Sequence, residues 1–297
     1  MSTDGYQTYY VPENSRLPIF MAIGLAVTVI GAGTMMNDMT AGVEDSSAHW
    51  VMFTGFIIIA ATLYTWFAKV IAENHGGLYS GQLNRSFVWG MGWFIFSEVM
   101  FFAAFFGALY YVRNLAVPWL AGEGDKGISA MLWPEFQAAW PLMETPDATQ
   151  FAGPKEVIHP WGLPLVNTIL LLSSSVTVHL AHTALKAGNR ARLKMWLAIT
   201  IVLGLAFLGF QIEEYAEAYN ELGLTLKSGI YGSTFFMLTG FHGAHVTIGA
   251  FMLMVMLLRA FKGHFTPQEH FGFEAASWYW HFVDVVWVGL FIFVYIM

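Results

Sequence analysis

The stretch FSEVMFFAAFFGALYY, residues 96–111, decides the fold. It is almost wholly apolar and does not alternate polar and apolar residues, as a strand of a membrane β-barrel would. Inside a bilayer, backbone polar groups must hydrogen-bond within their own segment, so we predict a helix here. Glu98 is the single charged residue of the stretch.

Six further stretches are similarly apolar and about 20 residues or longer, the length that crosses a hydrocarbon core. We therefore predict an all-α integral membrane protein with seven transmembrane helices. The expected cores are 17–36, 50–70, 87–112, 163–185, 193–212, 231–258 and 275–296. They divide the chain into an N-terminal segment 1–16, helices one and two within 17–75, and helices three to seven within 76–297, with a long connection at 113–162.

The composition supports a lipid environment. Hydrophobic residues make up 57% of the 297 residues and charged residues only 11%, whereas soluble domains contain about 25% charged residues. The net charge of −7 argues against nucleic acid as a partner. The chain has no cysteine, which excludes disulfides, thiolate metal sites and cysteine nucleophiles.

Basic residues predict the orientation. The N-terminus and connections 71–86, 186–192 and 259–274 lie on one side of the membrane, and nine of the 13 Lys and Arg residues are on or beside that side. The other four are Arg113, Lys126, Lys155 and Lys227. The positive-inside rule then places the N-terminus in the cytoplasm or an organelle matrix, and an odd number of spans places the C-terminus outside.

Glu98 lies about 16 Å along its predicted helix, close to the middle of the membrane. A carboxylate there costs at least ~2.5 kcal/mol, so we expect it to be neutral, paired or facing a wet cavity. It is either a protonatable group beside a proton or ion path or a protonated acid with one structural hydrogen bond.

Two histidine pairs, His179 with His182 and His242 with His245, have a spacing that puts each pair on one helix face. Together with His281 they could bind haem or two metal ions. Di-iron bundles, however, need several glutamates facing such histidines, and only Glu98 and Asp284 lie deep in the predicted spans. We therefore expect hydrogen bonds between helices and no metal on this chain.

Arg259, Lys262 and His264 end the sixth predicted helix on the basic side. They are either anchors whose charged ends reach the interface or a site for phospholipid headgroups, because clustered cations at that depth suit phosphate. Trp66 and Glu73, with Lys69, end the second helix at the same level and could line that site.

Four segments carry a resemblance to a known family. They are GMGWFIFSEVMFF (90–102), LPLVNTILLLSSSVTVHLAH (163–182), IYGSTFFMLTGFHGAHVTIGAF (230–251) and HFGFEAASWYWHFVDVVW (270–287). They resemble subunit III of haem–copper cytochrome c oxidase, in the same order and over about residues 50–297. The first 16 residues and 115–155 match poorly.

The resemblance implies a subunit without haem or copper, both of which belong to subunits I and II. It implies direct packing on subunit I and helices one and two that form a phospholipid-holding cleft against helices three to seven. Glu98 matches the family's intramembrane carboxylate near the proton-uptake side. The positions matching those around the lipid sites are Trp66, Glu73, Arg259, Lys262, His264 and Thr266, while Glu269 departs from the histidine common in mitochondrial relatives.

From the resemblance we expect a non-redox core subunit of a proton-pumping terminal oxidase that passes electrons from cytochrome c to oxygen. The alternatives are a membrane cytochrome that uses the histidine pairs, a quinol oxidase subunit III and a transporter. We expect quinol oxidase forms to have five spans and a shorter chain. A transporter would have a pair of helices broken by Pro or Gly, and this sequence shows no such pair. The long connection 113–162 favours the bacterial inner membrane over an organelle.

Overall fold

A computed structural model describes residues 9–12, 14–43, 45–125 and 127–297. The described part is helical and has no strand. Most of the predicted segment 1–16, and Lys126, lie outside the described residues. The seven predicted spans are confirmed, because the described residues contain seven helices long and apolar enough to cross a membrane.

The chain forms two compact units, Met1–Phe87 and Val88–Met297. The first unit holds the hairpin of α1 (Leu17–Ala41) and α2 (Ala48–His75), and it ends within α3 (Gly81–Tyr111). The Tyr79 and Phe87 rings have centroids 5.2 Å apart, which ties the start of α3 to the connection before it.

The third helix is longer than predicted. After Tyr111 the chain continues as a π-helical turn, η1 (Val112–Ala116), and as α4 (Val117–Leu120). Pro118 lacks an N–H and its ring would press on a carbonyl four residues earlier, and the wider π turn before it absorbs that mismatch. The long connection predicted at 113–162 therefore begins at residue 121, after a helical segment of 40 residues.

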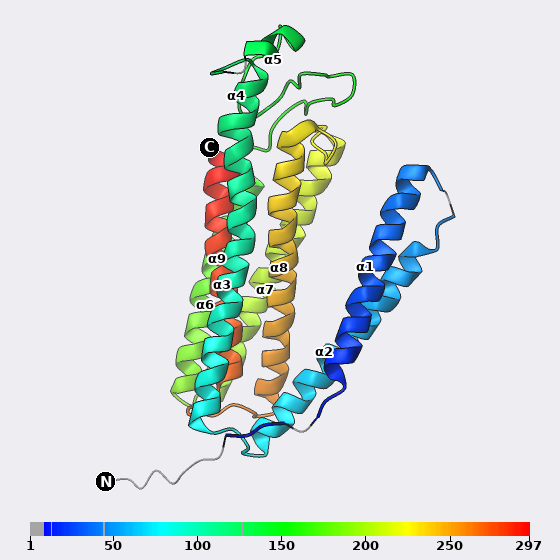
Figure 1. Cartoon of the computed structure of the whole chain (residues 1–297). Coiled ribbons are helices and arrows are strands. Elements are labelled where there is room, and N and C mark those ends of the chain that lie inside the picture. Colours follow the sequence, from blue (N-terminus) through cyan, green and yellow to red (C-terminus); the bar gives the residue numbers. More distant parts are fainter. Residues whose placement is uncertain (1–8, 13, 44, 126) are drawn as a thin grey trace. The chain divides into compact units, whose positions relative to one another are not determined.

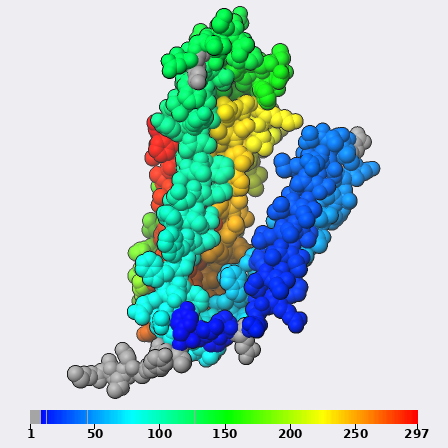
Figure 2. Space-filling view, viewed as in Figure 1, coloured from blue at the N-terminus to red at the C-terminus, as the bar shows by residue number. Residues whose placement is uncertain are grey.

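The remainder of the second unit is a bundle of four long helices (Figure 1). Their bounds are α6 (Leu163–Lys186), α7 (Arg190–Asn220), α8 (Gly229–Phe261) and α9 (Phe271–Leu290), the last extended by the π-helical η2 (Phe291–Ile296). Each helix packs on the next, and α6 also packs on α9. Figure 2 shows α3 and α8 touching along one face of this unit.

The core of the bundle is built around indole rings of α9. Trp280 and Trp287 are fully buried, and their N–H groups donate to Ser174 and Thr168 of α6 at 2.9 and 3.0 Å. A buried indole needs such an acceptor, because its N–H has no water to bond. These bonds fix the rotation of α9 against α6.

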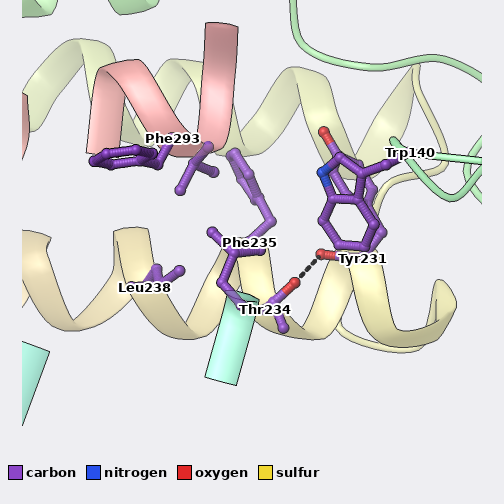
Figure 3. Close-up of a pocket in the computed structure, with 8 residues that line it drawn as sticks. Trp140, Tyr231, Thr234, Phe235, Leu238 and Phe293 are labelled. Atoms are coloured by element: carbon purple, nitrogen blue, oxygen red, sulfur yellow. Dashed lines mark hydrogen bonds between the residues drawn. The ribbon is translucent and has the colours of Figure 1, made fainter. Parts of the chain in front are cut away.

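The connection between α4 and α6 lies on the end of the bundle. It contains the short helix α5 (Gly127–Leu132) and buries Leu142 and Ile158. Trp140 packs edge-on against Tyr231 of α8, with ring centroids 5.4 Å apart (Figure 3). Trp140 therefore covers the end of α8, whereas Trp161 is mostly exposed.

The close approach of α7 to Trp280 gives a stability prediction. A Cβ at Gly204 would lie 2.6 Å from the Trp280 ring, which Ser174 and Gly249 hold from other sides. We expect Gly204→Ala to lower the free energy of unfolding in detergent by about 1–3 kcal/mol, because overpacking a closed core forces side chains off their rotamers. A Cβ at Gly209 would meet no atom within 4 Å. Gly209→Ala is the matched control, and equal stability of the two variants would contradict the packing argument.

Candidate functional site

Glu98 of α3 is paired with His245 of α8. The His245 Nε2 atom lies 2.8 Å from the Glu98 Oε2 atom. The side chains are 12% (His245) and 22% (Glu98) exposed, so the pair is largely enclosed without being sealed. The structure therefore joins two residues that the sequence analysis had treated separately, the intramembrane carboxylate and one member of a histidine pair.

Aromatic rings surround the pair. The His245 ring lies 5.7 Å from Phe101 and 4.9 Å from Phe102, measured between centroids, and it stacks on Tyr279 of α9 at 6.4 Å. Phe94 of α3 also stacks on Tyr279, with ring centroids 6.0 Å apart. Such a low-dielectric surrounding strengthens the interaction between the carboxylate and the imidazole.

The hydrogen-bond geometry indicates that the pair shares a proton. The His245 Nδ1 atom lies 2.6 Å from the Phe241 carbonyl oxygen, which only accepts, so Nδ1 carries a hydrogen. One further proton then sits between Nε2 and the carboxylate. Whether it resides on Glu98 or on His245, the pair then has no net charge. This lowers the free-energy cost of placing the carboxyl group in a bilayer.

Two other histidines also bond between helices, as predicted. His242 of α8 is buried, and its Nε2 atom lies 3.1 Å from the Val283 carbonyl oxygen of α9. The His281 Nδ1 atom lies 2.7 Å from the Ser175 hydroxyl oxygen of α6. The prediction of interhelical hydrogen bonds is confirmed for these two residues and for His245. His242, His245 and His281 each bond a different neighbour, so these three rings do not share a common centre.

One buried acid was missed by the sequence analysis. The pattern placed residues 213–230 in a connection, but α7 continues to Asn220 and buries Glu214 completely. Glu214 Oε1 accepts hydrogen bonds from the Tyr295 hydroxyl at 2.6 Å and from the Gln211 amide at 3.1 Å. The spacing of Gln211 and Glu214, three residues apart on one helix face, was the available signal.

The second unit carries four of the six predicted lipid-contact residues at the end of α8. Arg259 is half-buried, with its guanidinium carbon 4.7 Å from the centre of the Phe265 ring. Its Nε atom is buried without a hydrogen-bond partner among the described residues. Lys262 is exposed, and the backbone N–H of His264 donates to the Arg259 carbonyl. Thr266 closes the following turn by accepting from the Glu269 N–H at 2.9 Å.

The first unit carries the other two, Trp66 and Glu73. Trp66 is 49% exposed and stacks on Phe67. Glu73 is only 13% exposed and accepts hydrogen bonds from the hydroxyls of Tyr10 and Tyr79, at 3.2 and 3.1 Å. Its carboxylate is therefore bonded to protein groups, a role that the sequence did not predict.

Burial and the hydrogen bond to Glu73 raise the pKa of Tyr79, in the connection between α2 and α3. Lys69 adds a distant ion pair to Glu73, with Nζ 3.9 Å from the carboxylate. Tyr79 thus stays protonated and remains a donor to Glu73. The cluster tethers the described residues before α1 to the end of α2.

The sequence of this chain is similar to a known protein family over most of its length. A family described as "Cytochrome c oxidase subunit III" matches residues 7–122 and 128–297. The chain belongs to this family. The match covers most of 115–155, which the sequence analysis had expected to match poorly, and omits only a few residues of that connection.

Individual relatives agree with the family match. Cytochrome c oxidase subunit 3 of Marchantia polymorpha is 38% identical over 298 residues, covering 99% of this chain and 98% of that protein. The subunit 3 of Arabidopsis thaliana is 36% identical, covering 97% of this chain and 96% of its own. The subunit 3 of Oryctolagus cuniculus is 41% identical over 246 residues, covering 82% of this chain and 83% of that protein. The chain is thus a subunit of an oxidoreductase complex and has partner subunits.

The shared proton predicts strong coupling between Glu98 and His245. We expect Glu98→Leu and His245→Leu each to destabilise the second unit by about 1–3 kcal/mol, because each leaves a buried polar partner unsatisfied. The double variant should cost less than the sum, since it removes both polar groups. Unfolding in detergent measures the three variants, with the exposed His179→Leu as control. Strict additivity would show that the two side chains do not share a proton.

Proposed function

We propose that this chain is a non-redox core subunit of a proton-pumping terminal oxidase that passes electrons from cytochrome c to oxygen. In this role it sustains proton uptake and the stability of subunit I. The observation that carries the proposal is the pair of Glu98 and His245, which holds one proton deep in the second unit at no net charge. Haem and copper would belong to subunits I and II, and this chain would bind phospholipid only.

The pair supports proton handling by a simple step. A proton that moves from the Glu98 carboxyl to His245 Nε2 turns a neutral pair into an ion pair without changing the total charge. Loss of that proton to a neighbouring acceptor leaves one negative charge, which the layer of Phe101, Phe102 and Tyr279 disfavours. The pair would therefore readily take up a proton again and act as a local proton reserve.

Phospholipid binding is proposed at the ends of α8 and α2, each within its own unit. Lys262 is exposed and Arg259 is only half-buried, so we expect both cations to attract a phosphate group. The exposed Trp66 has the amphipathic ring typical of a headgroup-level residue. Glu73 supports such a site indirectly, by holding Tyr10 and Tyr79.

Location and partners complete the proposal. Subunit I is the expected direct partner and subunit II a second partner within the complex. Nine of the 13 Lys and Arg residues lie on or beside the side that holds the N-terminus and the connections 71–86, 186–192 and 259–274. This excess supports an N-terminus in the cytoplasm and a C-terminus in the periplasm of a bacterial inner membrane.

Glu98→Gln tests the proton role in the assembled oxidase. The amide keeps the size and a hydrogen bond but cannot exchange a proton as an acid does. We expect normal assembly, unchanged haem and copper per complex, slower proton uptake and a shorter turnover lifetime, all measured in reconstituted vesicles. Glu98→Asp, which keeps the acid, should restore part of the uptake. A Gln variant that fails to assemble would make Glu98 structural, and one with unchanged uptake would remove the proposed reserve.

Arg259→Ala and Lys262→Ala test the lipid role. Each cation near an anionic headgroup contributes about 1 kcal/mol, or roughly fivefold in affinity. We expect each variant to lose bound phospholipid, measured as lipid phosphorus per purified complex after detergent washing. Lys227→Ala removes a cation near the opposite end of α8 and should lose none. Equal lipid content in all variants would exclude headgroup binding by these cations.

A further inference from the structure

Three donor side chains meet where α6 ends and α9 begins. His182 comes from the last turns of α6, His270 directly precedes α9, and Glu274 lies in the first turn of α9. The Glu274 Oε1 atom lies 3.2 Å from His182 Nε2 and 3.4 Å from His270 Nε2. One ligand atom from each residue lies within 4.8 Å of the other two.

The tautomer of His270 is set by its neighbour. Its Nδ1 atom lies 3.1 Å from the Thr266 carbonyl oxygen, which only accepts, so Nδ1 carries the hydrogen. In the neutral ring, Nε2 then has a lone pair and faces the Glu274 carboxylate. The His270 side chain is only 9% exposed, and Nε2 has no hydrogen-bond partner among the described residues. Two electron-rich atoms held this way need a positive charge between them.

His182 adds a third electron-rich atom to the same place. Its Nε2 atom is also buried without a hydrogen-bond partner in the described part of the chain. One proton forms a hydrogen bond between two atoms, whereas a metal ion binds three or four at once. The cluster therefore fits a metal ion better than a proton.

The spacing and the donor types agree with zinc. Zn²⁺ binds histidine nitrogen and carboxylate oxygen at about 2.0–2.2 Å in a tetrahedron, which places neighbouring ligand atoms about 3.3–3.6 Å apart. The separations of 3.2 and 3.4 Å measured from Glu274 are close to that range. Two imidazoles with one carboxylate are also a set that binds Zn²⁺ with a fourth position left open.

The surroundings hold the ligands in place. Metal-binding histidines usually donate their other N–H to a carbonyl or carboxylate, as His270 does to Thr266. Thr266 is itself fixed, because its N–H donates to the Glu269 carbonyl and its hydroxyl accepts from the Glu269 N–H. The His182 ring packs on Phe273 with centroids 5.7 Å apart. Lys186, one turn later on α6, is exposed, so water screens its charge.

We propose that His182, His270 and Glu274 form a binding site for a divalent transition-metal ion of the Zn²⁺ class, which ties the end of α6 to the start of α9. The site uses one histidine of a pair that the sequence analysis had assigned to interhelical bonding, and two residues that it had not considered. It departs from the expectation that no metal binds this chain.

Zinc binding to the purified oxidase tests the site. The complex is stripped with a chelator and titrated with Zn²⁺, and bound zinc is measured by elemental analysis after gel filtration. We expect His182→Ala, His270→Ala and Glu274→Ala each to bind one zinc less per complex, or to bind that zinc at least ~10-fold more weakly. His179→Ala removes an exposed histidine one turn away on α6 and should bind as the unmodified complex does.

Identical zinc content and affinity in all complexes would overturn the proposal and leave the cluster as a proton-binding site. A second measurement does not depend on any variant assembling. Crystals of the unmodified oxidase soaked in Zn²⁺ should give anomalous scattering at the zinc edge between these three side chains. Absence of that signal would also overturn the proposal.

Discussion

Hydrocarbon offers a polar atom no hydrogen-bond partner, so polar groups within the spans must find one in the protein. This constraint explains why the interior of the second unit is held by a small number of long-range polar contacts. Trp280 and Trp287 of α9 donate to α6, and His242 bonds the backbone of α9. Where the group is an acid, as at Glu98, the partner also removes the net charge. These few polar contacts thus specify which helix faces which.

Much of the fold could be predicted from hydropathy alone, because seven apolar stretches of membrane length leave few alternatives. The ends of the helices could not. Polar residues such as Arg113 and Glu214 signal the edge of the hydrocarbon layer, but a helix continues beyond that edge as long as its backbone bonds are satisfied. The third helix therefore reaches Leu120, and α7 reaches Asn220. Hydropathy measures the environment of a segment and not where its helix stops.

The candidate sites were predictable as residues but not as partnerships. The depth of Glu98 and the spacing of His242 and His245 were visible in the sequence, yet only the packing of α3 on α8 selects His245 as the partner. Glu73 shows the opposite case. Its position suggested a lipid contact, whereas hydroxyls 63 residues before it and six residues after it occupy its carboxylate. Such contacts depend on how distant segments fold back, and a single sequence contains no direct sign of them.

The indole of Trp280 lies against Gly204 of α7 and Gly249 of α8 while it is bonded to α6. Trp280 of α9 consequently contacts each of the other three long helices of the bundle. A slide of α9 by a single turn, about 5.4 Å, would drive the ring into positions that have a Cβ and would break its hydrogen bond. The helices of this bundle therefore cannot slide past one another by a turn. When a partner displaces one of them, we expect all four to move together as a rigid body.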